Sequence, residues 1–350
     1  MKTNTVKAFG TEAADQDLKQ IEIQRREPTD SDIEIEIMYC GVCHSDLHTA
    51  KNDWGNSAYP VVPGHEIVGK VTRIGSSVTK LKVGDYAAVG CLVDSCKSCS
   101  SCEQDLEQYC LNGWVGTYNG EDKHLGGMTY GGYSQKVVVD EHFVLKVPAN
   151  LDLAATAPLL CAGITTWSPL KHWKVGKGSK VAVVGLGGLG HMAIKLAKGL
   201  GAEVTLFSRS PNKEQDAKDL GADTVIISTD DKQMQEVTGK FDVIIDTVPY
   251  VHDVNPYVAT LNISGTLVLV GYLGGLEPIL NTVPMIMGRK SVAGSLIGGI
   301  AETQEMLNFC GEHNIVSDIE LIKMQDINTA YDRMLKSDVK YRFVIDMASL

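Results

Sequence analysis

Four closely spaced cysteines constrain this 350-residue chain more than any other feature of its sequence. They lie in the stretch VGCLVDSCKSCSSCEQDLEQYC with the spacing C-x2-C-x2-C-x7-C, and they are Cys96, Cys99, Cys102 and Cys110. The two-residue gaps let three sulfurs of one tight loop converge on one centre, and the longer segment returns the fourth. Four thiolates around a d10 ion, with bonds of about 2.3 Å, make a closed structural zinc site. The alternatives are loose thiols or an iron–sulfur cluster, although such clusters often have a proline after the last cysteine, where this chain has Leu111.

Composition indicates a protein of a reducing compartment. The chain has nine cysteines, an odd number, and its opening MKTNTVKAFGTEAADQDLKQ contains no apolar segment like that of a secretory signal. In a reducing compartment disulfides are rare and thiolates serve metals. No apolar run approaches the roughly 20 residues of a membrane helix, and a formal charge of −11 disfavours nucleic acid, whose phosphates need a basic face. We therefore expect a cytoplasmic protein of two domains, with no membrane and no nucleic-acid partner.

A second, more dispersed set of ligand types indicates a catalytic metal. Cys43 stands in CGVCHSDLH, and His65 and Glu66 stand in VPGHEIVG. A scattered Cys–His–Cys set is typical of a zinc that keeps its fourth position open for water or substrate, and Cys161 in APLLCAGITTW can supply the third ligand. Simpler interpretations exist: Cys161 can be a small buried apolar residue, and Cys40 with Cys43 forms a C-x2-C pair that could exchange disulfides. No thioredoxin-like pattern surrounds that pair.

The second half of the chain alternates buried strands with helices. KVAVVG is a continuous apolar strand, and GLGGLGHMAIKLAKGLG continues into a helix with apolar residues at helical spacing. Further strands follow at EVTLFS, TVIIS, FDVIIDTV and GTLVLVGY, the last ending at Tyr272, so we predict a doubly wound parallel sheet. Gly185, Gly187 and Gly190 form G-x-G-x-x-G between the first strand and its helix. There the glycines permit a tight turn, a close approach to a pyrophosphate and tight helix packing.

The end of the second predicted strand distinguishes between the two nicotinamide cofactors. NAD sites commonly place an acidic residue about 20 residues after the glycines, to accept from the ribose 2′-hydroxyl. This chain has Ser208, Arg209 and Ser210 there, with Lys213 following, and Glu203 stands at the other end of the strand. Two cations and two hydroxyls suit a 2′-phosphate, which a guanidinium can bind through two hydrogen bonds. We therefore predict NADP(H), the alternative being a solvated turn with incidental charges.

Five motifs in this order resemble the zinc-containing medium-chain alcohol dehydrogenases: CGVCHSDLH, GHE, the four-cysteine spacing, LLCAG and GLGGLGH. Further segments are similar to the cinnamyl alcohol dehydrogenase subgroup, including its microbial NADP-dependent aldehyde reductases: KNDWG, GCLVDSC, DLEQYC, IDTVP and VKYRFVIDM. This resemblance implies two zinc ions per chain. The catalytic ion would be held by Cys43, His65 and Cys161, with Glu66 as an alternative ligand. The structural ion would be held by Cys96, Cys99, Cys102 and Cys110, leaving Cys40, Cys91 and Cys310 without a ligand role.

The same resemblance implies an α/β architecture with a GroES-like, β-rich catalytic domain and a Rossmann nucleotide-binding domain. The alternating segments DIEIEI and IVGKVTRIG agree with a β-rich first domain. We expect residues 1–159 and 298–350 to form the catalytic domain, to which YRFVIDM returns, and 160–297 to bind NADP. A homodimer joined edge to edge through SVAGSLIG (291–298) is also implied. The remaining expected cofactor contacts are Thr165, Gly188 and Leu189.

The expected reaction transfers hydride between NADPH and an aldehyde whose carbonyl is polarised by zinc acting as a Lewis acid. Ser45 follows the Cys43 ligand by two residues, so its hydroxyl can sit beside the substrate oxygen, and His48 can exchange protons near neutral pH. The resemblance implies a proton relay from Ser45 through the nicotinamide ribose hydroxyl to His48, with Asp53 nearby. A simpler interpretation makes Ser45 a helix cap and His48 a surface histidine. Glu66 completes the predicted catalytic set.

Trp54, Trp114 and Ile297 are the candidate substrate-pocket residues, and none carries a cation that would bind a carboxylate. We therefore expect uncharged aromatic or medium-chain aldehydes, with broad specificity because one methylene discriminates by only about 1–3 kcal/mol. Both tryptophans could instead be packing residues, since most tryptophans are largely buried. The alternative function is a catalytically silent NADPH-binding protein of the same fold, which would be expected to lose catalytic-zinc ligands. A zinc-free quinone reductase of the same superfamily would lack both zinc sites.

Overall fold

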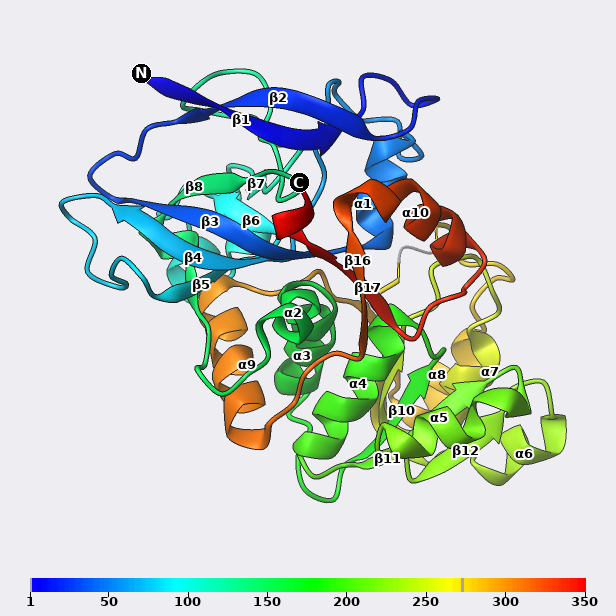
Figure 1. Ribbon diagram of the computed structural model, residues 1–350. Helices are drawn as coiled ribbons and strands as arrows, with labels where there is room; N and C mark the ends of the chain where they lie inside the picture. The colour runs from blue at the N-terminus through cyan, green and yellow to red at the C-terminus, as the bar shows by residue number, and fades with distance from the viewer. Residues whose placement is uncertain (1, 272–273) are drawn as a thin grey trace. The chain divides into compact units, whose positions relative to one another are not determined.

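The computed structural model describes residues 2–271 and 274–350, and it divides into two compact units (Figure 1). The first unit holds the chain up to Cys161 together with Gly298–Leu350. The second unit holds Ala162–Ile297. The chain therefore leaves the first unit once and returns to it once.

A seven-stranded sheet forms the centre of the first unit. Its order is β16-β17-β3-β4-β5-β9, and β8 pairs with β3 beside this path. The strands β16 and β17 run parallel, and the other pairs are antiparallel. Their bounds are β3 Asp32–Gly41, β4 Ile67–Ile74, β5 Tyr86–Val89, β8 Lys136–Asp140, β9 Leu145–Lys146, β16 Ile319–Lys323 and β17 Arg342–Asp346.

Two ribbons and several short helices complete the first unit. The ribbons are β1 (Thr3–Gly10) with β2 (Lys19–Arg26), and β6 (Leu92–Asp94) with β7 (Val115–Gly116). The α-helices are α1 His44–Ala50, α2 Leu153–Thr156, α9 Ile300–His313 and α10 Ile327–Leu335. The 3-10 turns are η1 Cys102–Gln104, η2 Glu107–Tyr109, η3 Glu141–Phe143, η4 Ala157–Leu160, η6 Met324–Asp326 and η7 Met347–Ser349.

Strand β3 shows why this sequence makes a central strand. Its alternate residues Ile33, Ile35 and Ile37 are 0%, 0% and 4% exposed, as the period of two in a strand requires. Glu34 lies between them and is also buried, because its carboxylate pairs with the ammonium of Lys136 at 3.2 Å. The polar face of β3 is therefore covered at Asp32 and Glu34 and open at Glu36, a difference that polar–apolar alternation alone would not indicate.

The C-terminal segment joins the sheet that the N-terminal half of the chain begins. Strand β17 pairs antiparallel with β3, with Val344 opposite Gly41 and Asp346 opposite Tyr39. This pairing brings a late part of the chain to the end of β3, two residues before Cys43. The residues around Cys43 are thus built from both ends of the sequence.

Six parallel strands in the order β12-β11-β10-β13-β14-β15 form the sheet of the second unit. The order runs outward from β10 in both directions, so the predicted doubly wound sheet is confirmed. The bounds are β10 Lys180–Val184, β11 Glu203–Ser208, β12 Thr224–Ile227, β13 Phe241–Asp246, β14 Leu261–Leu269 and β15 Ser291–Gly294. Strand β14 begins four residues earlier than predicted, and the predicted end at Tyr272 lies outside the described residues.

Helix α3 precedes the first strand of the second unit, and the other helices alternate with its strands along the chain. They are α3 Ala162–His172, α4 Gly188–Gly199, η5 Pro211–Lys213, α5 Glu214–Asp219, α6 Asp231–Glu236, α7 Asn255–Thr260 and α8 Thr282–Gly288. The sheet core is apolar, as in a parallel sheet covered on both faces. Val181, Leu206 and Ile244 are each 0% exposed.

The glycine-rich turn between β10 and α4 has the geometry that its sequence predicts. Gly185 has φ +88°, a left-handed conformation that glycine adopts at no steric cost. A side chain at Gly190 would collide with the carbonyl oxygen of Gly185, so the helix can approach the strand only because glycine stands there. Gly187 is the N-cap of α4, and no atom lies within 4 Å of where its Cβ would be. The turn is therefore open on the side that an anion would approach.

Within the described residues, no single helix is long and apolar enough to cross a membrane. One bent pair, Leu153–Leu160 with Ala162–His172, passes the same test on length and composition alone. Most residues of this pair are buried inside the protein.

Candidate functional site

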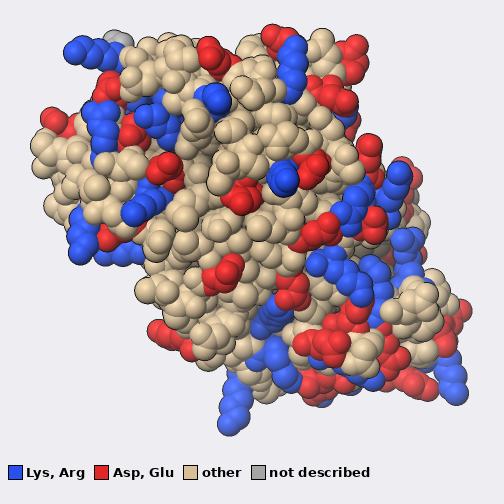
Figure 2. Space-filling view, viewed as in Figure 1, with Lys and Arg blue, Asp and Glu red and all other residues tan. Residues whose placement is uncertain are grey.

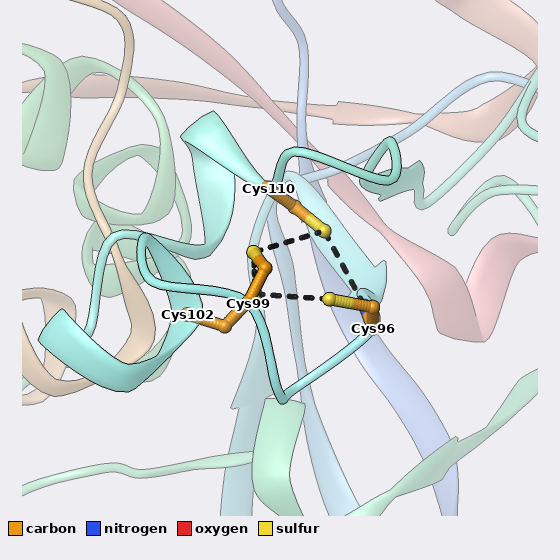
Figure 3. Close-up of side chains that lie close together, drawn as sticks. All are labelled: Cys96, Cys99, Cys102 and Cys110. Atoms are coloured by element: carbon orange, nitrogen blue, oxygen red, sulfur yellow. Dashed lines mark hydrogen bonds between the residues drawn. The ribbon is translucent and has the colours of Figure 1, made fainter.

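The four-cysteine loop forms a closed tetrad of sulfur atoms (Figure 3). The Sγ atoms of Cys99 and Cys102 lie 3.6 Å apart, those of Cys96 and Cys102 3.9 Å, and those of Cys99 and Cys110 4.0 Å. A tetrahedron with metal–sulfur bonds of about 2.3 Å separates its corners by about 3.8 Å. All nine cysteines of the chain are free thiols, so the loop is not a disulfide knot. The spacing fits one zinc ion.

Backbone amides around the tetrad favour thiolates, the form that binds zinc. The amide of Cys96 donates to Sγ of Cys110 at 3.4 Å, and the amide of Leu111 donates to Sγ of Cys99 at 3.3 Å. Hydrogen bonds from the Ser98 amide and the Asn112 side chain lower the pKa of Cys96 to about 5. The chemistry of the donor set thus agrees with its geometry.

A second cluster brings together Cys43, His65, Glu66 and Cys161, whose ligand atoms all lie within 4.8 Å of one another. Cys43 is the N-cap of α1, His65 and Glu66 directly precede β4, and Cys161 directly precedes α3. The Sγ atoms of Cys43 and Cys161 are 3.8 Å apart. The predicted ligands are therefore adjacent in space, although 118 positions separate the two cysteines in sequence.

Two ligand atoms of this cluster are buried without a hydrogen-bond partner in the described protein, Nε2 of His65 and Oε2 of Glu66. A buried polar atom left unpaired costs about 1–3 kcal/mol, so such atoms need an explanation. A cation at the centre of the cluster satisfies both atoms. The cluster therefore fits a zinc ion held by two sulfurs and a nitrogen, with Glu66 within reach.

The pKa values of Cys43 and Glu66 also agree with a metal site. The hydrogen bond from Cys161 and the imidazole of His65 lower the pKa of Cys43 well below that of an ordinary thiol, against the opposing effect of burial. Burial raises the pKa of Glu66 to about 7, although the guanidinium of Arg342 opposes this effect. A metal-binding thiolate thus stands beside a carboxyl group that has one oxygen, Oε2, without a protein partner.

Asp46 organises the residues behind the cluster, although nothing in the sequence marks it as part of the site. Its fully buried carboxylate accepts hydrogen bonds from the amides of Cys43 at 2.8 Å and Gly64 at 3.0 Å, and from the Tyr133 hydroxyl at 3.1 Å. It lies 3.6 Å from Nδ1 of His65. The acid thus lies on the Nδ1 side of the ring, which leaves Nε2 for the metal. The only signal in the sequence was an acidic residue at the third position of a helix.

Two further residues support the cluster, and the sequence did not reveal them either. The hydroxyl of Tyr118 lies 3.2 Å from Nδ1 of His65, and the two rings stack with their centroids 5.4 Å apart. Arg342, from β17, forms a buried ion pair with Oε1 of Glu66 and donates to the carbonyl oxygen of Val42 at 2.9 Å. Neither residue is close in sequence to the ligand that it contacts.

The predicted relay residues lie on α1 and in the loop after it. Oγ of Ser45 is 3.7 Å from Sγ of Cys43, and Nδ1 of His48 is 2.7 Å from a carboxylate oxygen of Asp53. Ser45 does not cap the helix, because the N-cap is Cys43. The His48 side chain is 31% exposed, and its ring lies 5.5 Å from that of Trp54. His48 is therefore a partly buried residue with a defined partner.

Outside the two clusters, Cys40, Cys91 and Cys310 take no part in any candidate metal group of the described residues. Cys43 contacts Cys161 and not Cys40, so the redox alternative for the C-x2-C pair gains no support. Trp54 and Trp114 are both partly accessible, each residue being 39% exposed. They are therefore not core packing residues. Ile297 is buried at 9% exposure and has φ +35°.

In the second unit, the predicted phosphate-binding residues gather near the carboxyl ends of β10 and β11. The ammonium of Lys213 donates to the carbonyl oxygen of Leu186, inside the glycine-rich turn, at 2.9 Å. Ser208 and Ser210 bond to one another across the strand end, and Arg209 between them is exposed. Glu203 lies at the opposite end of β11, as expected. The other predicted contacts are Gly188 and Leu189, at the start of α4, and Thr165, buried in α3.

Two family descriptions match this chain. Residues 29–149 match the alcohol dehydrogenase GroES-like domain, and residues 188–312 match the zinc-binding dehydrogenase domain. The chain is 53% identical to a probable mannitol dehydrogenase of Medicago sativa (98% of this chain, 96% of the relative). It is 51% identical to aldehyde reductase YahK of Escherichia coli and 51% identical to an NADP-dependent alcohol dehydrogenase C of Mycolicibacterium smegmatis, with 99% of both chains covered in each comparison.

Solved structures agree with these relatives. A cinnamyl alcohol dehydrogenase from Sorghum bicolor superposes with a TM-score of 0.94 at 46% identity, over 99% of this chain and 98% of that one. The cinnamyl alcohol dehydrogenase of Helicobacter pylori, solved as a complex with NADP(H), superposes with a TM-score of 0.91 at 42% identity, over 99% of both chains. The chain belongs to the zinc-containing alcohol dehydrogenases, in the group of the cinnamyl alcohol dehydrogenases.

Proposed function

We propose that this protein is a zinc-dependent alcohol dehydrogenase that uses NADP(H) and works mainly as a reductase of uncharged aldehydes. One observation carries this proposal: the ligand atoms of four residues converge, and two of these atoms, Nε2 of His65 and Oε2 of Glu66, are buried without a protein partner. The four residues are Cys43, His65, Glu66 and Cys161. The E. coli relative is named an aldehyde reductase, and the M. smegmatis relative an NADP-dependent alcohol dehydrogenase. Both names support this activity. The silent alternative gains no support, because every predicted ligand is present and in place.

The zinc ion, when bound, supplies a Lewis acid that polarises the carbonyl, and the nicotinamide supplies hydride. Proton transfer is the task of residues on and after α1. The hydrogen bond between Nδ1 of His48 and Asp53 leaves Nε2 of His48 to hold or release the transferred proton. Ser45 stands nearer the metal ligands, 3.7 Å from Sγ of Cys43, so its Oγ delivers that proton to the product oxygen.

Two features of the second unit support NADP(H) as the cofactor. Arg209 has no carboxylate partner among the described residues, so its charge is available to a 2′-phosphate. Lys213 carries a second positive charge at the glycine-rich turn. We accordingly assign 160–297 to the NADP-binding domain and 1–159 with 298–350 to the catalytic domain.

The substrate class rests on side-chain chemistry. Trp54, Trp114 and Ile297 are the residues proposed to line the pocket, and all three are apolar or aromatic. The face of the molecule seen in Figure 2 carries acidic and basic side chains intermixed, and the net charge is −11. Small neutral aldehydes are therefore the proposed substrates.

The proposed location is the cytoplasm, with which the free thiols agree.

A second copy of this chain is the proposed partner, bound through the edge of the second unit's sheet. Strand β15 pairs on one side with β14, and α8, which directly precedes β15 in the chain, has no buried residue. Val283, Ile286 and Met287 of α8 are 63%, 76% and 82% exposed. Such a group of large exposed apolar side chains marks an interaction surface, and an unpaired strand edge can pair with its own copy.

Light scattering after size exclusion tests the dimer. Ile286→Lys combined with Met287→Lys should convert the dimer to a monomer, whereas Leu335→Lys, at a residue 65% exposed on α10, should not. A wild-type mass equal to one chain would contradict the dimer.

The activity is tested by steady-state assays of purified protein with both cofactors, alongside metal analysis. Benzaldehyde, cinnamaldehyde and butanal should be reduced with NADPH at higher kcat/KM than pyruvate, and faster than the matching alcohols are oxidised at neutral pH. Mannitol belongs in the panel, because several relatives carry that substrate in their names. Bound zinc and bound NADPH without turnover of any of these compounds would instead support the silent alternative.

A further inference from the structure

Arg209 is oriented by one neighbour, Tyr250. A terminal nitrogen of the guanidinium donates to the Tyr250 hydroxyl at 3.0 Å, and the guanidinium carbon lies 5.8 Å from the centre of the ring. Arg209 follows the end of β11, and Tyr250 lies in the loop after β13. Both strands flank β10 in the same parallel sheet, so their carboxyl ends meet at one edge. The contact joins two loops that are separated by 41 positions in sequence.

The loop that carries Tyr250 is fastened to the sheet through His252. Nδ1 of His252 lies 2.9 Å from the carbonyl oxygen of Tyr250, and Nε2 lies 3.0 Å from the carboxylate of Asp246, which is fully buried at the end of β13. Both partners are acceptors, so these contacts favour the imidazolium form of His252, in which both ring nitrogens donate. The other Asp246 oxygen accepts from the amide of Val248 at 3.1 Å. Asp246 thus holds the loop on both sides of Tyr250.

We propose that Tyr250 is a specificity-determining residue for the phosphorylated cofactor, because its hydroxyl holds Arg209 in the orientation that meets a 2′-phosphate. The inference rests on the proposed use of NADP(H) and identifies a further residue of that site. The hydroxyl accepts from Arg209, so its own proton remains available, and the described residues offer it no acceptor. A phosphomonoester dianion supplies such an acceptor and pairs with the guanidinium at the same time.

Orientation before binding matters because Arg is a long, flexible side chain. Ordering such a side chain on binding reduces affinity, and a neighbour that orders it beforehand reduces this loss. Lys213 lies elsewhere in the site, bonded to the glycine-rich turn through Leu186, and does not bond to Tyr250. Tyr250 should therefore act through Arg209 and affect ligands that carry the 2′-phosphate.

The test compares two fragments of the cofactor that differ in that phosphate alone: adenosine 2′,5′-bisphosphate and adenosine 5′-monophosphate. Their Kd values would be measured by calorimetry on the full-length wild type, Tyr250→Phe, Arg209→Ala and the double variant. Removing one hydrogen bond should weaken the bisphosphate about two- to tenfold and leave the monophosphate unchanged. In the Arg209→Ala background, Tyr250→Phe should hardly change the Kd of the bisphosphate, because the guanidinium that Tyr250 orients is gone.

A matched control is Tyr86→Phe, which removes an exposed hydroxyl on β5 of the first unit and should alter neither Kd. Thermal melts of every variant establish that each is folded. Unchanged or tighter binding of the bisphosphate by Tyr250→Phe, or equal losses for both fragments, would overturn the role of Tyr250 and leave the use of NADP(H) standing. A wild type that binds both fragments equally would overturn the cofactor proposal and this inference together.

Discussion

The carboxylate of Asp46 lies 3.6 Å from Nδ1 of His65, and both side chains are buried. The same carboxylate accepts the backbone amide of Cys43, so one acid contacts two of the residues that surround the candidate catalytic zinc. It therefore orients the ligands before any metal arrives.

Asp46→Asn should weaken binding of the catalytic zinc by about 10- to 100-fold. The amide nitrogen of Asn would face donors that now meet a carboxylate, which would disturb the backbone of Cys43 and the acid beside His65. Zinc loss to a chelator, followed by mass spectrometry, measures the effect, and the four-cysteine site in the same molecule serves as the internal control. Equal retention of both ions by the variant and the wild type would show that Asp46 does not position the ligands.

Elemental analysis should find two zinc ions per chain. Cys99→Ser should destabilise the protein, because three thiolates hold the structural ion weakly and the loop depends on that ion for its shape. Cys43→Ser should abolish turnover and leave the melting temperature nearly unchanged. Fully active protein that contains one zinc ion or none would contradict the two-site assignment.

Ser45→Ala should lower kcat severely while both zinc ions stay bound, because the first carrier of the proton is lost. General acid–base groups typically contribute about 100-fold or more. His48→Ala should lower kcat less than Ser45→Ala does, since water can partly replace a side chain that is 31% exposed. Presteady-state and steady-state turnover with one aldehyde would rank the two variants. Near-normal kcat in zinc-loaded Ser45→Ala would exclude the proposed path.

Wild-type kcat/KM should be higher with NADPH than with NADH, and Arg209→Asp should reduce or reverse the difference. Losing a charge-assisted bond to phosphate costs about 1.5–3 kcal/mol, which corresponds to roughly tenfold or more in binding. The new carboxylate would also repel the phosphate and could accept from a ribose hydroxyl. Lys171→Asp in α3 is a charge-matched control. The assignment fails if the unmodified enzyme uses both cofactors equally.

Stability should depend on pH through His252. The hydrogen bond with Asp246 raises the pKa of His252 above its usual value, against the opposing effect of burial, and Asp253 adds to the rise. The charged groups that face this imidazole are Asp246 and Asp253, and the ring of Tyr257 packs edge-on at 6.0 Å. A raised folded pKa gives stability that is complete below the unfolded value of about 6.5 and is lost as pH rises through the folded value. The difference in Tm between wild type and His252→Gln should therefore shrink between pH 6 and pH 9, and a constant difference would contradict the charged pair.

Much of the site could be predicted from sequence because its parts are local. The four structural cysteines lie within 15 consecutive positions, so their spacing alone determines that the sulfurs can meet. The glycine-rich turn is equally local, since Gly185 and Gly190 each meet a steric need of one strand–turn–helix unit, and Gly187 leaves the turn open. Alternation of apolar residues in DIEIEI likewise reports on a single strand.

The residues that support the site could not be read in this way, because their partners are far apart in the chain. Arg342 and Glu66 are separated by 276 positions and meet only since β17 pairs with β3. Arg209 and Tyr250 meet because two parallel strands end at the same edge of a sheet. No spacing rule in the sequence connects such pairs. The sequence by itself determined which residues could bind zinc and a nucleotide. Only the tertiary structure decided which buried charges and hydroxyls hold them in place, because strand pairing sets these contacts.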